Sequence, residues 1–201
     1  ARGDRMTSTT KNSTSAVDNG GGSDAWDNLT GIVSGDSGNA AGVSINNSET
    51  NYIKVYFGLT TSDIPSGSTI DGIQFAAHVD GDSNSVQDVH VYLVKAGTVQ
   101  TGGTNKANAA RWKNGLSGTT QTYGANASVS STWGVTVTDS DLRSASFGIA
   151  ISATGDSGDS AWVDYVALTV WYTAPAGGRY FVQAHLNGLS CAGPKNFNPL
   201  A

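Results

Sequence analysis

The stretch from Ile70 to Val94, IDGIQFAAHVDGDSNSVQDVHVYLV, constrains the fold more than any other part of the chain. Apolar residues occupy alternate positions on both sides of a polar run, namely Ile73, Phe75, Ala77 and Val79 before it and Val89, Val91 and Leu93 after it. A period of two is typical of a strand that is buried on one face. The polar run from 81 to 87 is rich in Gly, Asp, Ser and Asn, which favour turns. We therefore expect two strands, and pairing them as a hairpin centred near Asn84 places His78 opposite His90.

Further strand-like segments follow at similar spacing along the chain. They lie at 41–45, 52–59, 119–123, 133–138, 147–151 and 162–172. Only Asp139–Arg143 has the pattern of a helical turn, with an Asp cap. Short strands without a long helix predict an all-β antiparallel β-sandwich or barrel. About eight strands favour a jelly-roll-like sandwich, with an immunoglobulin-like sandwich as the alternative.

The two ends of the chain differ in composition from this β-rich centre. Residues 1–24 are mostly Thr, Ser, Asn and Gly with almost nothing apolar, so we expect an extended N-terminal arm held by a neighbouring subunit. Residues 25–173 are predicted to form the β-sandwich domain. Residues 174–201 form a C-terminal extension, in which RYFVQAHL at 179–186 is expected to add one strand to its own sheet edge or to a neighbour's.

Composition narrows the classes of partner. Charged residues make up 13% of the 201 residues, the net charge is −5, and Lys and Arg do not cluster, so nucleic acid is not an expected partner. No apolar run reaches the roughly 18 residues of a membrane span. The N-terminus lacks the apolar core of a signal peptide, which predicts synthesis in the host cytoplasm. The single cysteine, Cys191, excludes an internal disulfide and is expected to be an unpaired thiol.

Several turn and core motifs carry a family resemblance. They are IPSGSTIDGI at 64–73, VYLVKAG at 91–97, Trp133-Gly134, Asp141-Leu142, FGIAI at 147–151 and VDYV at 163–166. Over residues 25–173 the chain resembles a loosely defined group of β-sandwich domains in bacteriophage structural proteins and in some bacterial surface proteins. The resemblance implies a non-enzymatic virion part, such as a head decoration (cement) protein or a tail or fibre module. It implies no catalytic residues.

The predicted hairpin also suggests a metal site. It brings His78 and His90 together on one face, with Asp80 and Asp88 beside them. Two imidazoles and two carboxylates are a ligand set that Zn²⁺ accepts, and cross-strand neighbours lie about 5 Å apart. The alternative is that these four residues are polar side chains on a solvated or subunit-contacting face.

A second cation hypothesis concerns the turns. Asp80-Gly-Asp82-Ser-Asn84 begins like a calcium-binding loop, but Ser85 stands where Gly is expected and Val91 where a bidentate Glu is expected. Asp156 and Asp159, in GDSGDS, supply further oxygen ligands only if the two loops converge. Ordinary turns are the alternative, and we expect no resident cofactor.

Catalytic motifs are missing from the sequence. The three histidines have no nucleophile-elbow, zinc-protease or phosphate-loop motif around them. No pair of carboxylates stands out as a glycosidase acid and base. The sequence therefore predicts that the protein is not an enzyme.

The aromatic residues raise the main functional question. Tyr52, Tyr56, Tyr92, Tyr165 and Trp171 all take the outward phase of their predicted strands. Such a face stacks sugar rings in carbohydrate-binding modules, or is covered by protein at an interface. We favour assembly: a homo-oligomeric capsid decoration protein on the particle surface, bound to the major capsid protein or to other virion subunits. The alternative is a receptor- or carbohydrate-binding module of a tail fibre or cell-surface protein.

Overall fold

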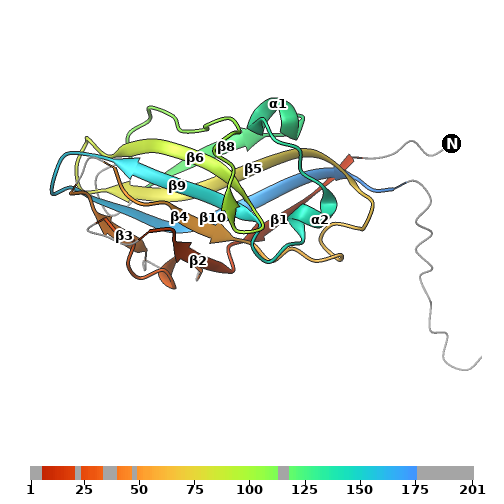
Figure 1. The fold of residues 1–201 in the computed structure, drawn as a ribbon, viewed down its shortest axis with the longest axis horizontal. Helices are drawn as coiled ribbons and strands as arrows, with labels where there is room; N and C mark the ends of the chain where they lie inside the picture. Colours follow the sequence, from red (N-terminus) through yellow and green to blue (C-terminus); the bar gives the residue numbers. More distant parts are fainter. Residues whose placement is uncertain (1–5, 21–23, 34–39, 47–48, 113–117, 176–201) are drawn as a thin grey trace, which may run out of the picture.

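The computed structural model describes residues 6–20, 24–33, 40–46, 49–112 and 118–175, which form an all-β sandwich of two antiparallel sheets (Figure 1). Sheet A has the order β1-β10-β5-β8, and β3 pairs with the first part of β10 on the same edge as β1. Its strands are β1 (Met6–Asn12), β3 (Ala41–Ser44), β5 (Thr69–Gly81), β8 (Thr119–Ala125) and β10 (Ser160–Thr173).

Sheet B has the order β2-β4-β9-β6-β7. Its strands are β2 (Ser15–Asp18), β4 (Ile53–Tyr56), β6 (Gln87–Lys95), β7 (Thr98–Val99) and β9 (Gly148–Thr154). The described helices are short: η1 (Gly31–Val33), α1 (Val129–Trp133) and α2 (Asp139–Leu142).

The core lies between the sheets, where the apolar alternation placed it. On β5 the inward residues Ile73, Phe75, Ala77 and Val79 are all fully buried. Phe75 packs edge-on against Trp133, with ring centroids 5.6 Å apart, and lies 5.4 Å from Phe57, which follows β4 of the other sheet. Burying a side chain of this size stabilises the fold by roughly 1.5–3 kcal/mol. The aromatic cluster therefore joins the two layers.

The predicted hairpin between β5 and β6 is wrong. β5 pairs with β10 and β8 in sheet A, whereas β6 pairs with β9 and β7 in sheet B. A hairpin would set both apolar rows on the same side of one sheet. When the connection crosses between the sheets, the two rows instead face each other and bury one another.

Residues 6–18 do not form the free arm that their composition suggested. β1 pairs with β10 along seven residues, and β2 pairs with β4. Between the two strands, the Ser13 amide donates to Val166 O of sheet A and the Thr14 amide donates to Tyr56 O of sheet B. Backbone pairing holds these strands, so their lack of apolar side chains did not prevent their ordering. The expected strand at 179–186 and Cys191 lie outside the described residues.

Two local predictions had different outcomes. The segment 133–138, expected to be β-rich, is not a strand: Trp133 ends α1, and Gly134 continues in the left-handed conformation with φ 68°. The helical turn at α2 is confirmed, but its cap is Thr138, whose side chain forms a capping box with Asp141.

The crossing between sheets at Ser13 supports a stability prediction. Ser13 is 5% exposed, and its hydroxyl donates to Ile32 O over 2.7 Å. Ser13→Ala leaves this buried carbonyl without that donor, so we expect the free energy of unfolding to fall by about 1–3 kcal/mol in urea denaturation. Ser8→Ala, at an exposed position of β1, is the control and should change it by less than about 0.5 kcal/mol. Equal effects of the two variants would contradict a structural role for the crossing.

Candidate functional site

The five predicted surface aromatics lie on two opposite faces of the sandwich. Tyr165 and Trp171 project from β10 on the outside of sheet A, while Tyr52, Tyr56 and Tyr92 belong to the outside of sheet B. They do not form one continuous aromatic surface. The prediction treated outward phase as a single direction, although each layer of a sandwich has an outside of its own.

The outer face of sheet A is mostly uncharged, and its acidic side chains, Asp80 opposite Trp162 and Asp164 at the bulge in β10, lie towards one end. We define its uncharged part by these outward positions of the paired strands: Ser8, Thr10, Asn12, Gln74, Ala76, His78, Thr120, Thr122, Tyr165, Ala167, Thr169 and Trp171. All of these residues are exposed or half-buried. The hydroxyls of Thr10 and Thr169 bond each other across β1 and β10 over 3.0 Å. The result is a strand-built surface rich in hydroxyls and bearing two large aromatic rings.

At one end of this face, His78 contacts two residues of β10. The His78 ring stacks on Tyr165 with centroids 5.5 Å apart and planes 21° apart. A β-bulge between Val163 and Tyr165 places Asp164 beside the same ring, with its Oδ2 3.5 Å from His78 Nδ1. The bulge therefore orients Asp164 and Tyr165 toward His78 together.

The aromatic residues outside sheet B are largely covered by their own neighbours. Tyr56 is 8% exposed and packs with buried Val94 and Ala150, and Tyr52 lies against this cluster. The His90 ring stacks on Tyr92, with centroids 5.9 Å apart. Burial raises the pKa of both Tyr52 and Tyr56. This cluster therefore behaves more like a small second core than like an open binding surface.

A Ser, Glu and His also meet at this cluster. Glu49 Oε1 accepts a hydrogen bond from Ser152 Oγ at 3.0 Å and lies 2.7 Å from His90 Nδ1. Activation of a serine nucleophile requires the imidazole to stand between the hydroxyl and the carboxylate. Here the carboxylate stands in the middle and Ser152 is fully buried. The group links β6, β9 and the segment before β4.

The four predicted zinc ligands are not brought together. His78 and Asp80 belong to β5 of sheet A, His90 lies on the outside of sheet B, and Asp88 points into the core. The hypothesis depended on the β5–β6 hairpin, which does not form. Within the described ranges, no three His, Cys, Asp or Glu side chains are arranged to hold a metal ion.

Asp88 is the polar centre of the interior. It is 5% exposed, and its Oδ1 accepts from Trp112 Nε1 at 2.9 Å and from the Tyr123 hydroxyl at 2.8 Å. Burial raises the pKa of Asp88, and these two hydrogen bonds act in the opposite direction. Burial and the neighbouring carboxylate also raise the pKa of Tyr123. The carboxylate thereby ties β6 of sheet B to β8 of sheet A and to the connection between β7 and β8.

Sequence reasoning assigned Asp88 to the outside because it assumed unbroken alternation along β6. A β-bulge between Asp88 and His90 shifts the phase, so Val86 and Asp88 point inward before it and Val91 and Leu93 after it. Trp112 and Tyr123, each with one polar hydrogen to satisfy inside a core, are the residues that signal a buried acceptor.

The two loops of the calcium hypothesis do converge. Asp159 Oδ2 accepts from Ser83 Oγ at 2.7 Å, from Ser85 Oγ, and from the Asp156 amide at 2.8 Å. Hydrogen bonds lower the pKa of Asp159, and the bond from Ser85 has the largest effect. The Ser160 amide donates to Asp82 Oδ1 at 2.8 Å. Through these hydrogen bonds, the two carboxylates join the β5–β6 connection to the β9–β10 connection.

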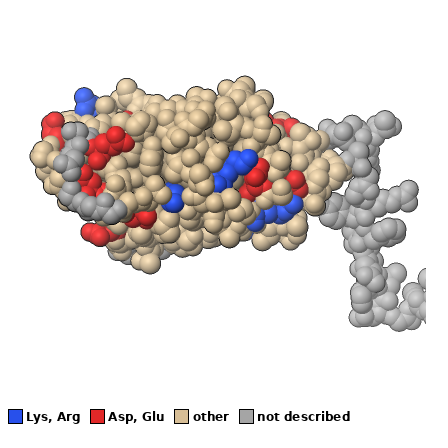
Figure 2. Space-filling model, in the orientation of Figure 1, with Lys and Arg blue, Asp and Glu red and all other residues tan. Residues whose placement is uncertain are grey.

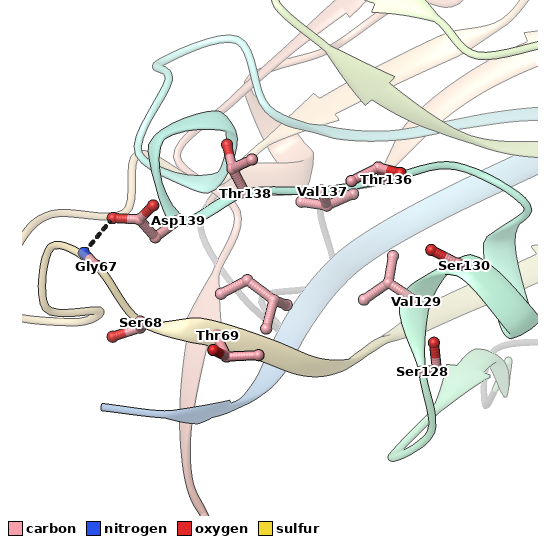
Figure 3. A pocket seen from close by; sticks show the side chains of 11 residues that line it. Gly67, Ser68, Thr69, Ser128, Val129, Ser130, Thr136, Val137, Thr138 and Asp139 are labelled. Carbon is pink, nitrogen blue, oxygen red and sulfur yellow. Dashed lines mark hydrogen bonds between the residues drawn. The ribbon is translucent and has the colours of Figure 1, made fainter. Parts of the chain in front are cut away.

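Among the hollows on the described surface, two have polar side chains around them. One, of about 380 Å³, is lined mainly by hydroxyl side chains around Val129 and Val137, and at its rim Asp139 accepts from the Gly67 amide (Figure 3). Asp139 is also paired with Arg143 at 2.8 Å, and the Gly67 bond lowers its pKa. The second hollow, of about 260 Å³, lies beside Trp162.

Comparison with family models, with curated proteins and with solved structures finds no match to this chain. None of the helices in the described part of the chain is long and apolar enough to cross a membrane.

The Asp88 network generates a pH prediction. Its folded-state pKa lies above the ordinary value of 3.8, so the folded state binds the proton more tightly than the unfolded state. The contribution of Asp88 to stability is therefore complete below about pH 3.8 and is lost as pH rises through the folded-state pKa. Asp88→Asn cannot titrate. We expect the stability of wild type relative to Asp88→Asn to decline from pH 3 towards pH 7 in urea unfolding.

The exposed substitution Asp27→Asn controls for the change in net charge in this experiment. Asp88→Leu adds a second measurement, because it leaves the Trp112 and Tyr123 donors without their acceptor at a cost of about 1–3 kcal/mol for each. A wild-type advantage over Asp88→Asn that is constant with pH would contradict a raised pKa.

Proposed function

We propose that this protein is a non-enzymatic structural subunit of a bacteriophage particle, a head decoration protein that binds the assembled shell through the outer face of sheet A. The observation that carries the proposal is the character of this face, which is largely uncharged, rich in hydroxyls and marked by Tyr165 and Trp171. Protein interfaces are enriched in Tyr and Trp and depleted in charge at their centres.

The rest of the surface is compatible with this role. Most of the face drawn in Figure 2 consists of uncharged residues, with few Lys and Arg side chains. A phosphate backbone would require a concentration of positive charge, and the 11 Lys and Arg residues of this chain do not cluster in its sequence. A neutral surface instead suits contact with other protein subunits.

Strand order adds support at the level of the fold. From β3 onward the sheets read β3-β10-β5-β8 and β4-β9-β6-β7. We propose that this winding is that of a jelly roll, an architecture found in viral capsid and lectin domains. A fold does not determine a function, so the winding supports the proposal without carrying it.

The mechanism is binding that favours the assembled state. A subunit that binds only the completed shell stabilises it by mass action, and contacts with several shell subunits at once raise the effective affinity. Residues 6–18 belong to the sandwich itself, so in this proposal the sheet face, and not a free N-terminal arm, makes the contact.

Co-sedimentation tests the proposal. The full chain is mixed with assembled shells of the virus that encodes it and, separately, with the unassembled shell protein. We expect saturable binding to the assembled shells alone and a loss of at least about tenfold in affinity for Trp171→Ala, because truncated interface aromatics commonly cost 2 kcal/mol or more. Tyr92→Ser, on the outside of sheet B, is the matched control.

Absence of binding to assembled shells would overturn the proposal, and so would equal binding to the unassembled protein. Equal losses in Trp171→Ala and Tyr92→Ser would show that the outer face of sheet A is not the contact.

A carbohydrate-binding module is the second candidate, and the hollow at Trp162 favours it. The Trp162 indole lies over Gly42, where an added Cβ would come within 2.8 Å of the ring. Around it stand the exposed Asp27 carboxylate and the hydroxyls of Ser44 and Ser160. An aromatic platform ringed by a carboxylate and hydroxyls has the elements that bind a single neutral sugar ring.

A glycan array probed with the full chain tests this second candidate. We expect saturable binding to a neutral glycan that falls at least about tenfold in Trp162→Ala, which is the loss of about 1.4 kcal/mol. Trp171→Ala should retain the binding, since it changes a different end of β10. Failure of every glycan to bind would remove this candidate and leave the shell proposal standing.

A further inference from the structure

We infer that the outer edge of β1, which no described strand pairs, pairs with β1 of a second copy of this chain, in antiparallel register, to make a two-fold symmetric dimer with one continuous sheet. The inference concerns an edge of sheet A rather than its outer face. It therefore goes beyond the proposed function and stands whether the protein binds a shell through that face or a glycan beside Trp162.

The direction of the backbone groups along β1 follows from one hydrogen bond. The Ser13 amide donates to Val166 O over 3.0 Å, continuing the register in which Asn12 is opposite Ala167. Bonded and non-bonded positions alternate along an antiparallel pair. The N–H and C=O groups of Thr7, Thr9 and Lys11 therefore face β10. Those of Met6, Ser8, Thr10 and Asn12 face away from it, on the open side of the strand.

The edge of β6 shows how this chain covers a strand edge elsewhere. β7 pairs with the end of β6. Farther along, the side chain of Asn105 takes the place of a neighbouring strand, because its Oδ1 accepts from the Val91 amide and its Nδ2 donates to Val89 O, both at 2.9 Å. The Trp112 amide donates to Val86 O farther along. Nothing in the described part of the chain does the same for the open side of β1.

β1 also lacks the features that usually keep an edge from pairing. Such features are proline, a bulge, or charged side chains along the strand. The sequence MTSTTKN contains no proline, and the pairing with β10 runs through seven residues without a shift in register. The only charged side chain, Lys11, is already held by Asp63 at 3.1 Å. Three threonines favour the extended conformation.

The strand is complementary to itself. The backbone N–H and C=O groups that face away from β10 belong to the even-numbered residues. In two copies related by a two-fold axis through Thr9, these groups can bond each other, with Met6 opposite Asn12 and Ser8 opposite Thr10. Each Lys11 then stands opposite a Thr7, so the two lysines do not meet. A partner strand with charged side chains would find no opposite charges on β1, because Lys11 is already paired with Asp63. A second copy of β1 is therefore the partner that suits this edge.

The pairing rests mainly on backbone hydrogen bonds. No residue of β1 is buried in the single copy, and Met6 is 48% exposed. Strand addition of this kind draws its affinity from the main chain and its selectivity from alternate side chains. We therefore expect a concentration-dependent dimer in place of a permanent one.

Sedimentation velocity of the full chain over a range of concentrations is the first test. Ser8→Pro removes an outward N–H while leaving the bonds from Thr7 and Thr9 to β10, since a proline nitrogen carries no hydrogen. We expect wild type and the control Ser8→Ala to dimerise, and Ser8→Pro to weaken dimerisation at least tenfold with an unchanged urea midpoint. A wild type that stays monomeric throughout, or a Ser8→Pro that dimerises equally well, would overturn the inference.

Disulfide trapping tests the register. In the inferred pair, Thr9 is opposite its own symmetry mate at a non-hydrogen-bonded position, where α-carbons lie about 4.5 Å apart, within disulfide range. In a Cys191→Ser background, Thr9→Cys should form covalent dimers on mild oxidation, and Thr7→Cys, which faces Lys11, should not. Trapping of Thr7→Cys in preference to Thr9→Cys would reject this register and with it the two-fold axis at Thr9.

Discussion

Two rows of apolar side chains, one from each sheet, have to face each other across a single interior. Phe75 of sheet A meets Phe57 from beside sheet B, and Trp133 packs on Phe75 and donates its indole N–H to Ile73 O of the same strand. Every connection that crosses between the sheets serves this requirement, because a chain that stayed in one layer would leave its apolar row exposed to water. The layout of the outer surfaces follows from it, since whatever does not face inward becomes one of two separate outsides.

The buried carboxylate of Asp88 is the exception within that interior. A charge in a core is costly unless hydrogen bonds replace its water, and Trp112 and Tyr123 supply such bonds from two different elements. The Trp112 side chain also fills space at 0% exposure. Packing and polar pairing are thus combined in one group, which holds Trp112 of the β7–β8 connection in the interior. Buried polar groups of this kind favour one arrangement over others that are equally apolar.

Sequence alternation was sufficient to predict which residues of β5, β4 and β10 point inward, because a period of two is a local property of the strand. It was not sufficient to predict which strands pair. The β5–β6 hairpin was wrong because pairing depends on where the opposite apolar row lies, and that is a property of the whole chain. The inward turn of Asp88 was missed because one bulge inverts the phase of every residue before it. The zinc hypothesis inherited both errors. The outward positions of Tyr165 and Trp171 were found correctly, but their separation from Tyr52, Tyr56 and Tyr92 needed the layers.

The pairing of β1 with β10 has a consequence for how the molecule is made. Met6 lies opposite Thr173. The first strand of the sandwich therefore cannot pair until its partner, at the end of the described domain, has been synthesised. Contacts between residues so far apart in sequence close slowly, and strands left open in the meantime are prone to associate with other chains. Sheet A therefore cannot reach its full width before β10 has been synthesised.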